Sequence, residues 1–192
     1  MDFGDESSHA RFLDLWPVGK IPVLRDHARE RTIPETSIII EYLDNHHSGA
    51  RPLIPCDASA LDARLWDRFF DTYVSVPMQK IVLDRIRPEE KGDPHGVAKA
   101  RATLDIAYAM IERQLAAKTW AVGEQFTIAD CAAAPALFFA HIVQPFSAVH
   151  THTAAYFERL VSRASVKRTL AEAKPYFQYF PYRERIPARF FD

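Results

Sequence analysis

The feature that most constrains the fold of this chain is an almost wholly apolar segment from Cys131 to Val143. Its hydrophobic residues cover nearly every face of a helix, and such a helix belongs where other elements surround it. The segment opens on Thr127-Ile128-Ala129-Asp130. Thr127 as the N-cap and Asp130 three residues later resemble a capping box, which satisfies helix N–H groups that otherwise have no partner. We therefore place this helix in the middle of a bundle, and we give Thr127 and Asp130 a structural role and no catalytic one.

Other helices are predicted on both sides of this segment. One stretch repeats an apolar or aromatic residue at every fourth position, with Leu61, Leu65, Phe69 and Tyr73 in the series. This period predicts a long helix, which Pro77 would kink. Residues 97–115 carry an apolar stripe with the 3.6-residue period of a helix that packs against a neighbour. Shorter helices are predicted at 153–163 and 166–174, and we expect the aromatic tail at 175–181 to pack on the bundle.

The first part of the chain predicts a different organisation. Residues 8–15 favour a short helix, and a strand at 21–25 runs into a polar turn at 26–30 that returns at 31–33, which is typical of a hairpin. Thr36 takes the N-cap position of a helix that ends within 45–49. The stretch 45–57 has no periodicity and contains two prolines. We therefore predict an α+β chain with a small first domain at 1–47, a linker at 48–57 and an all-helical domain at 58–192.

Composition excludes several classes of function. The chain has 192 residues, 48% of them hydrophobic, and a formal net charge of -1, which gives no electrostatic footprint for nucleic acid or an anionic membrane. No apolar run is long enough to cross a bilayer, and the acidic start at 1–6 does not fit a signal peptide, so we expect a cytoplasmic protein. The histidines and cysteines lack the spacing of a metal site, and no metal is expected.

The stretch from Gly19 to Thr36 is the best candidate for holding a ligand. Pro22 stands in a short apolar run where a central strand would need a backbone donor, so it fits an edge, a bulge or a cis turn. A cis bond before Pro22 would turn the N–H and C=O of Ile21 outward, where a peptide could pair with both. The alternative is that Pro22 simply begins a strand.

Three motifs in this order resemble the glutathione transferases, and the resemblance covers nearly all of the chain. The run Pro17-x-Gly19-Lys20-Ile21-Pro22-Val23-Leu24 is similar to the segment around the cis-proline of that family. Glu35-Thr36 with Ile38, Ile39, Tyr42 and Leu43 resembles its Glu-Ser-x-Ala-Ile-x-x-Tyr-Leu motif, with Thr36 in place of Ser. Gly123-Glu124-x-Phe126-Thr127-x-Ala129-Asp130 is similar to the capping box that opens the central helix of its C-terminal domain.

The resemblance implies a thioredoxin-like N-terminal domain, here partial, followed by the helical C-terminal bundle of the family. It implies that glutathione, as the substrate, binds at Lys20, Ile21, Pro22, Glu35 and Thr36. The main chain of Ile21 would pair with the cysteinyl unit, and the helix start at Thr36 would meet the γ-glutamyl carboxylate while Glu35 takes the ammonium. Lys20 would pair with the glycyl carboxylate or stay solvated. Alternatively, Glu35 and Thr36 are ordinary helix-start residues.

No catalytic residue is assigned from the sequence. In this family the Tyr, Ser or Cys that activates the sulfur belongs to a strand-helix-strand unit that precedes the segment seen here, and residues 2–20 are too few and too polar to supply it. We therefore expect the native product to be longer than a chain that begins at Met1. A pocket for an apolar electrophile is predicted from the aromatic residues Trp66, Phe69, Phe70 and Tyr73, for which core packing is the commoner role.

Two hypotheses of different kinds follow for the function. The first is an enzyme of transferase type that conjugates or reduces electrophilic small molecules with the glutathione thiolate, as in detoxification. The second is a non-catalytic, dimeric binding or regulatory module of the same fold, and a helical scaffold without a ligand is a weaker third. In each of the first two cases we expect a homodimer, by resemblance and because the apolar edge of the hairpin needs a cover.

Overall fold

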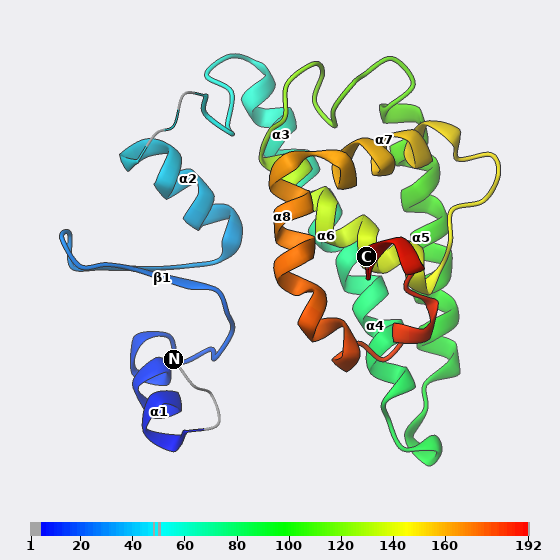
Figure 1. Ribbon diagram of the computed structural model, residues 1–192, viewed down its shortest axis with the longest axis horizontal. Helices are drawn as coiled ribbons and strands as arrows, with labels where there is room; N and C mark the ends of the chain where they lie inside the picture. The colour runs from blue at the N-terminus through cyan, green and yellow to red at the C-terminus, as the bar shows by residue number, and fades with distance from the viewer. Residues whose placement is uncertain (1–4, 48, 50, 192) are drawn as a thin grey trace. The chain divides into compact units, whose positions relative to one another are not determined.

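The computed structural model describes residues 5–47, 49 and 51–191 (Figure 1). The chain divides into two compact units, Met1–Ile54 and Pro55–Asp192. This division lies inside the range 48–57 that the sequence predicts as a linker. Within the described residues, no helix combines the length and the apolar character needed to cross a bilayer.

The first unit contains a two-stranded antiparallel hairpin between two helices (blue in Figure 1). Its elements are α1 at Glu6–Leu15, β1 at Val23–Asp26, β2 at Arg31–Pro34 and α2 at Thr36–His46. The strand begins at Val23, two residues later than predicted, because the chain turns at Ile21 and Pro22 before pairing begins. The N-cap of α2 is Glu35 and not Thr36, which is already helical. The prediction of Thr36 as the N-cap is therefore wrong by one position.

A buried tyrosine ties α2 to the hairpin. The hydroxyl of Tyr42 donates a hydrogen bond of 2.6 Å to Asp26, the last residue of β1. Arg29 pairs with the same carboxylate at 3.1 Å. The hydrogen bond from Tyr42, followed by those from Arg29, holds the pKa of Asp26 well below its usual range. Asp26 therefore stays ionised at neutral pH, and its two partners fix the helix and the turn to one strand end.

The second unit is a helical bundle built around α6, which spans Ile128–Val143. The other helices are α3 at Ser59–Phe69, a π-helical turn η1 at Phe70–Ser75, α4 at Val76–Arg85, α5 at Pro94–Gln114, α7 at Thr151–Ser162 and α8 at Ala164–Ala173. Figure 1 shows α6 inside this unit, and it contacts α3, η1, α4 and α7. The central place predicted for the apolar segment is thus confirmed.

Residues after α8 fold back on the bundle in short 3-10 turns. These are η3 at Lys174–Tyr179, η4 at Arg183–Arg185 and η5 at Ala188–Phe190; a further one, η2 at Glu89–Lys91, precedes α5. Phe177 is buried and its ring stacks on Phe138 of α6 at a centroid distance of 5.6 Å. The predicted packing of the aromatic tail on the bundle is confirmed for Phe177 and Phe180, whereas Tyr176 and Tyr179 are 68% and 75% exposed.

The apolar stripe predicted for α5 is its buried face, but in the series predicted to begin in α3 only Phe69 is buried. Leu61, Leu65 and Tyr73 are 75%, 59% and 51% exposed. The buried residues of α3 are Ala63, Asp67 and Phe69, and those of η1 are Phe70 and Val74. Ala63 has no exposed surface, because a small side chain allows close approach between α3 and its neighbour α6.

The predicted capping box at the start of α6 is present and is part of a larger network. Asp130 accepts hydrogen bonds from the backbone N–H of Thr127 at 2.7 Å and from its hydroxyl at 3.2 Å. Its other oxygen accepts from the backbone N–H of Ala121 at 2.9 Å and from the hydroxyl of Tyr156 at 2.6 Å. Burial raises the pKa of Asp130, which the hydrogen bonds offset in part. One buried carboxyl thus joins α6, α7 and the loop before α6.

A second carboxylate caps α7 from the side of α5. Glu112 accepts hydrogen bonds from the backbone N–H groups of His152 and Thr153 at 2.9 and 2.8 Å. It also accepts from the hydroxyls of Thr151 and Thr153. Burial by itself would raise the pKa of Glu112, but the hydrogen bonds outweigh burial and the net pKa is lowered. Glu112 therefore serves as an N-cap supplied by another helix.

We expect Glu112→Gln to lower the free energy of unfolding by about 1 kcal/mol at pH 7, as for loss of a helix cap. In the glutamine variant an NH2 group replaces one carboxylate oxygen. This NH2 group would face backbone N–H and hydroxyl donors and could not accept their hydrogen bonds. Because the folded-state pKa of Glu112 is lowered, its contribution is present above the unfolded-state pKa and is lost as pH falls through the folded-state value. Urea unfolding at pH 7 and at pH 3.5 measures this, and Glu90→Gln in η2 is the control. A difference that grows on acidification would contradict the prediction.

Candidate functional site

The strand register brings the two predicted halves of the ligand site together. Val23 of β1 pairs with Pro34 of β2 as the first rung of the hairpin. The next residues outward on the two strands are Pro22 and Glu35, so Ile21 and Thr36 lie at the same end of the ladder. Thr36 lies 14 positions after Pro22 in the sequence, and the hairpin closes that separation.

Ile21 presents its backbone at this end of the hairpin. The peptide bond between Ile21 and Pro22 is cis, which is one of the arrangements that a proline in this apolar run fits. Ile21 is 66% exposed. Within the described residues, neither its N–H nor its C=O has a hydrogen-bond partner. The two groups therefore offer a donor and an acceptor to an extended peptide.

Glu35 stands at the start of α2 in an uncommon backbone conformation. Its φ is 68° and its ψ is 122°, which for a residue with a side chain costs about 1–3 kcal/mol. Glu35 and Thr36 are exposed, and no side chain caps the helix among the described residues. The first-turn N–H groups and the positive end of the helix dipole are open to a carboxylate. Sequence patterns gave no signal for this conformation, because positive φ at a glutamate depends on the surrounding fold.

The remaining predicted residue, Lys20, lies directly before Ile21 and is exposed. Within the described part of the chain its ammonium has no ion-pair partner. The site thus combines a lysine, a backbone pairing edge, a glutamate and a helix N-terminus. This set of groups can hold a short peptide that carries both carboxylates and an ammonium.

The four aromatic residues proposed for an electrophile pocket do not share one environment. Phe69 and Phe70 are 6% and 1% exposed and belong to the core of the helical unit, in agreement with the core-packing alternative. Trp66 is half-buried and contacts Phe69 at 4.6 Å between ring centroids. Tyr73 is half-exposed and contacts the same ring at 5.3 Å. Only Trp66 and Tyr73 keep surface that a ligand could contact.

Comparison with known families decides the relationship of this chain. Residues 4–51 match the family model described as "Glutathione S-transferase, N-terminal domain", and residues 75–164 match the one described as "Glutathione S-transferase, C-terminal domain". The chain belongs to the glutathione S-transferase family. Its fold class is therefore the predicted one, with a thioredoxin-like N-terminal domain and a helical C-terminal domain.

Members of this family with known sequence or structure are similar over most of their length. Glutathione S-transferase GstB of Escherichia coli (strain K12) is 24% identical over 162 residues, which are 84% of this chain and 78% of that protein. A glutathione S-transferase of Methylobacillus flagellatus KT, solved with GSH bound, has a TM-score of 0.76 and 26% identity, covering 88% of this chain and 83% of the other. The enzyme of Methylobacterium radiotolerans, solved with glutathione sulfonate, has a TM-score of 0.71 and 27% identity, covering 85% and 77%.

Proposed function

We propose that this glutathione transferase-like protein binds glutathione at Lys20, Ile21, Pro22, Glu35 and Thr36. The observation that carries the proposal is the pairing of Val23 with Pro34, which puts the unpaired backbone of Ile21 beside the uncapped start of α2. In this arrangement Ile21 pairs with the cysteinyl unit and α2 receives the γ-glutamyl carboxylate. Glu35 receives the ammonium and Lys20 the glycyl carboxylate. The solved relatives with GSH or glutathione sulfonate bound support the choice of ligand.

We further propose that the bound thiol reacts, as a thiolate, with an apolar electrophile. The sulfur would form a bond to an electrophilic carbon as the leaving group departs, or reduce a peroxide. Ionisation of the thiol is the step that the protein must promote, because the thiolate is the nucleophile. The exposed parts of Trp66 and Tyr73 are the aromatic surface offered to the second substrate.

The test is calorimetry with glutathione followed by a conjugation assay with 1-chloro-2,4-dinitrobenzene and a reduction assay with cumene hydroperoxide. Saturable binding with turnover in either assay is the expected result. Binding without turnover of either electrophile would favour the non-catalytic binding module. If the protein does not bind glutathione at millimolar concentration, the site assignment is wrong.

We also propose a homodimer, which the exposed apolar residues of α3, η1 and α4 support. Leu61, Leu65, Val76 and Leu83 are 75%, 59%, 60% and 52% exposed, and Tyr73 lies between them in sequence. Apolar side chains gathered on consecutive helices favour a protein–protein contact over continued exposure to water. A second copy of the chain provides such a contact through an isologous interface.

We expect Leu65→Glu to convert the dimer into a monomer at micromolar concentration, because the carboxylate would be desolvated in the contact. Light scattering coupled to size exclusion measures the mass. Val149→Glu, at a loop position that is 75% exposed, is the matched control and should leave the mass unchanged. A dimer that persists in Leu65→Glu, or a wild-type monomer, would refute this interface.

A further inference from the structure

The charged residues of this chain are distributed unevenly. Residues 158–192 contain eight lysines and arginines against four aspartates and glutamates, which gives a formal charge of +4. Residues 1–157 contain sixteen against twenty-one, which gives -5. The cationic part comprises the end of α7, all of α8 and the turns η3, η4 and η5 of the second unit. The formal net charge of the whole chain therefore hides a local excess of positive charge.

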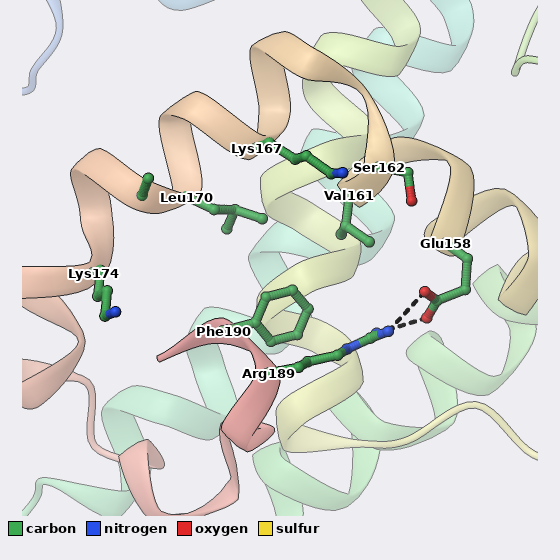
Figure 2. A pocket seen from close by; sticks show the side chains of 9 residues that line it. Glu158, Val161, Ser162, Lys167, Leu170, Lys174, Arg189 and Phe190 are labelled. Atoms are coloured by element: carbon green, nitrogen blue, oxygen red, sulfur yellow. Dashed lines mark hydrogen bonds and ion pairs between the residues drawn. The ribbon is translucent and has the colours of Figure 1, made fainter. Parts of the chain in front are cut away.

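Two hollows adjoin on this cationic part of the surface. The first lies between α7, α8 and η5 and has a volume of about 340 Å³ (Figure 2). The second lies between η3, η4 and the end of the described chain and has a volume of about 330 Å³. Because Lys174 lines both hollows, they meet at the end of α8. We call the combined surface the C-terminal groove, whose lining includes Lys167, Leu170, Lys174, Arg183, Phe190 and Phe191.

Each hollow contains one cationic side chain without an ionic partner. Within the described residues, Lys167 in the first hollow and Arg183 in the second form no ion pair and no side-chain hydrogen bond. Both are exposed. Lys174 already has an interaction of its own, so it serves only as lining. The two charges open to a ligand therefore lie in separate hollows of one groove, which favours an elongated ligand over a compact one.

The other arginines of the groove are held by carboxylates. Arg189 donates two hydrogen bonds to Glu158, at 2.8 and 2.6 Å (dashed in Figure 2). Glu184 pairs with Arg85 at 2.8 Å and lies 3.9 Å from Arg185. These two carboxylates in the lining would repel the closely spaced phosphates of a nucleic acid. A polypeptide can instead place acidic residues only where the unpaired cations lie.

Exposed aromatic rings flank the second hollow. Tyr176 and Tyr179 of η3 are both more than two thirds exposed, and each is next in sequence to a residue that lines the hollow. Side chains three residues apart eclipse in a 3-10 helix, so the two rings lie on one edge of η3, about 6 Å apart along its axis. Phe191 is a further 42% exposed ring in the lining. Tyrosine, phenylalanine and arginine are enriched where proteins contact one another.

We propose that the C-terminal groove docks an extended acidic segment of a partner protein. Carboxylates of the segment pair with Lys167 and Arg183, and an apolar side chain between them lies on Phe190. The negative charge of residues 1–157 repels the segment from the rest of the chain and directs it to this surface. This docking requires no glutathione, because every residue of the proposed glutathione site belongs to the first unit.

The probe for this docking is the fluorescein-labelled peptide EDDFEDDE, whose binding to the full chain is measured by fluorescence anisotropy. We expect a dissociation constant of about 10–100 µM at 50 mM salt, as fits a short segment with few anchors. Raising the salt to 300 mM should weaken binding by about fivefold, because exposed ion pairs are screened. Saturating glutathione should leave the affinity unchanged, so the result does not depend on the proposed function.

Variants of the charged and aromatic residues locate the peptide. The double variant Lys167→Met with Arg183→Gln should bind about tenfold more weakly, from the loss of two ion pairs. Its matched control is Lys118→Met with Arg87→Gln, which removes the same charges at exposed positions elsewhere in the unit and should change nothing. Tyr179→Ser should weaken binding at least about fivefold if this ring is an anchor of the contact. A thermal unfolding curve for each variant confirms that it is folded.

The analogue QNNFQNNQ tests the role of charge in the peptide, and we expect it to bind at least tenfold more weakly than EDDFEDDE. Equal affinity of the two peptides, or of the double variant and its matched control, would overturn the proposal. Oligothymidylate of eight nucleotides and vesicles with 30% phosphatidylserine are the competing polyanions. Tighter binding of either one than of the acidic peptide would also overturn it, in favour of a nucleic acid or a membrane as the occupant.

Discussion

Replacing Asp130 with alanine is expected to lower the free energy of unfolding of the helical unit by about 3–5 kcal/mol. Asp130 has no exposed surface, and its two oxygens accept four hydrogen bonds from Ala121, Thr127 and Tyr156. Alanine leaves all of these buried donors without a partner. Each unsatisfied buried group costs about 1–3 kcal/mol, which makes this the largest single-residue effect on stability that we predict.

Urea unfolding followed by far-ultraviolet circular dichroism measures the effect, because most of the helix lies in this unit. Tyr156→Phe removes only one of the four hydrogen bonds and should cost about 1 kcal/mol. Asp62→Ala, at an exposed position in the first turn of α3, is the matched control and should cost less than 1 kcal/mol. Equal unfolding midpoints for Asp130→Ala and Asp62→Ala would show that the network does not hold α6 in place.

The second large effect is a loss of glutathione affinity on replacing Glu35. This prediction rests on the proposed function. Glu35→Gln should weaken glutathione binding by about 10- to 100-fold, because a charge-assisted hydrogen bond to the ligand ammonium becomes a neutral one. The change is isosteric, and the carboxylate that it removes has no hydrogen-bond partner among the described residues. Folding should therefore be unaffected while glutathione binding is weakened.

Calorimetry with glutathione, together with a thermal unfolding curve for each variant, separates these two effects. Glu30→Gln makes the same substitution at an exposed residue in the turn between β1 and β2, and its affinity for glutathione should equal that of the wild-type protein. If Glu35→Gln binds glutathione as tightly as Glu30→Gln does, then Glu35 is an ordinary helix-start residue and the role assigned to it is wrong.

Helices whose buried face is built from large apolar residues could be predicted well from the sequence. The stripe from Val97 to Leu115 along α5 and the mainly apolar α6 both took the predicted place, because their apolar residues follow the burial that packing requires. The same reasoning failed for α3. Its buried face uses Ala63 and Asp67 and keeps only Phe69 of the predicted series, while Leu61 and Leu65 stay exposed. A ranking of residues by hydrophobicity predicts that leucine is buried before alanine. It therefore cannot identify a helix face on which a small side chain is needed so that another helix can approach closely.

The sequence by itself determined the family, the order of the elements and the residue types at the glutathione site, since these depend on local motifs such as Ile21-Pro22 and Glu35-Thr36. The tertiary structure decided which of these residues meet. The register of β1 and β2 sets Val23 opposite Pro34, so that Pro22 and Glu35 follow at the same end of the hairpin, and the backbone of Glu35 takes a positive φ that no local preference of glutamate would favour. The attachment of η5 to α7 likewise depends on the return of the chain after α8, which lets Arg189 pair with Glu158, 31 positions earlier in the sequence. Contacts between distant residues depend on how the packed elements close on one another, and that information is not held in any single stretch of the chain.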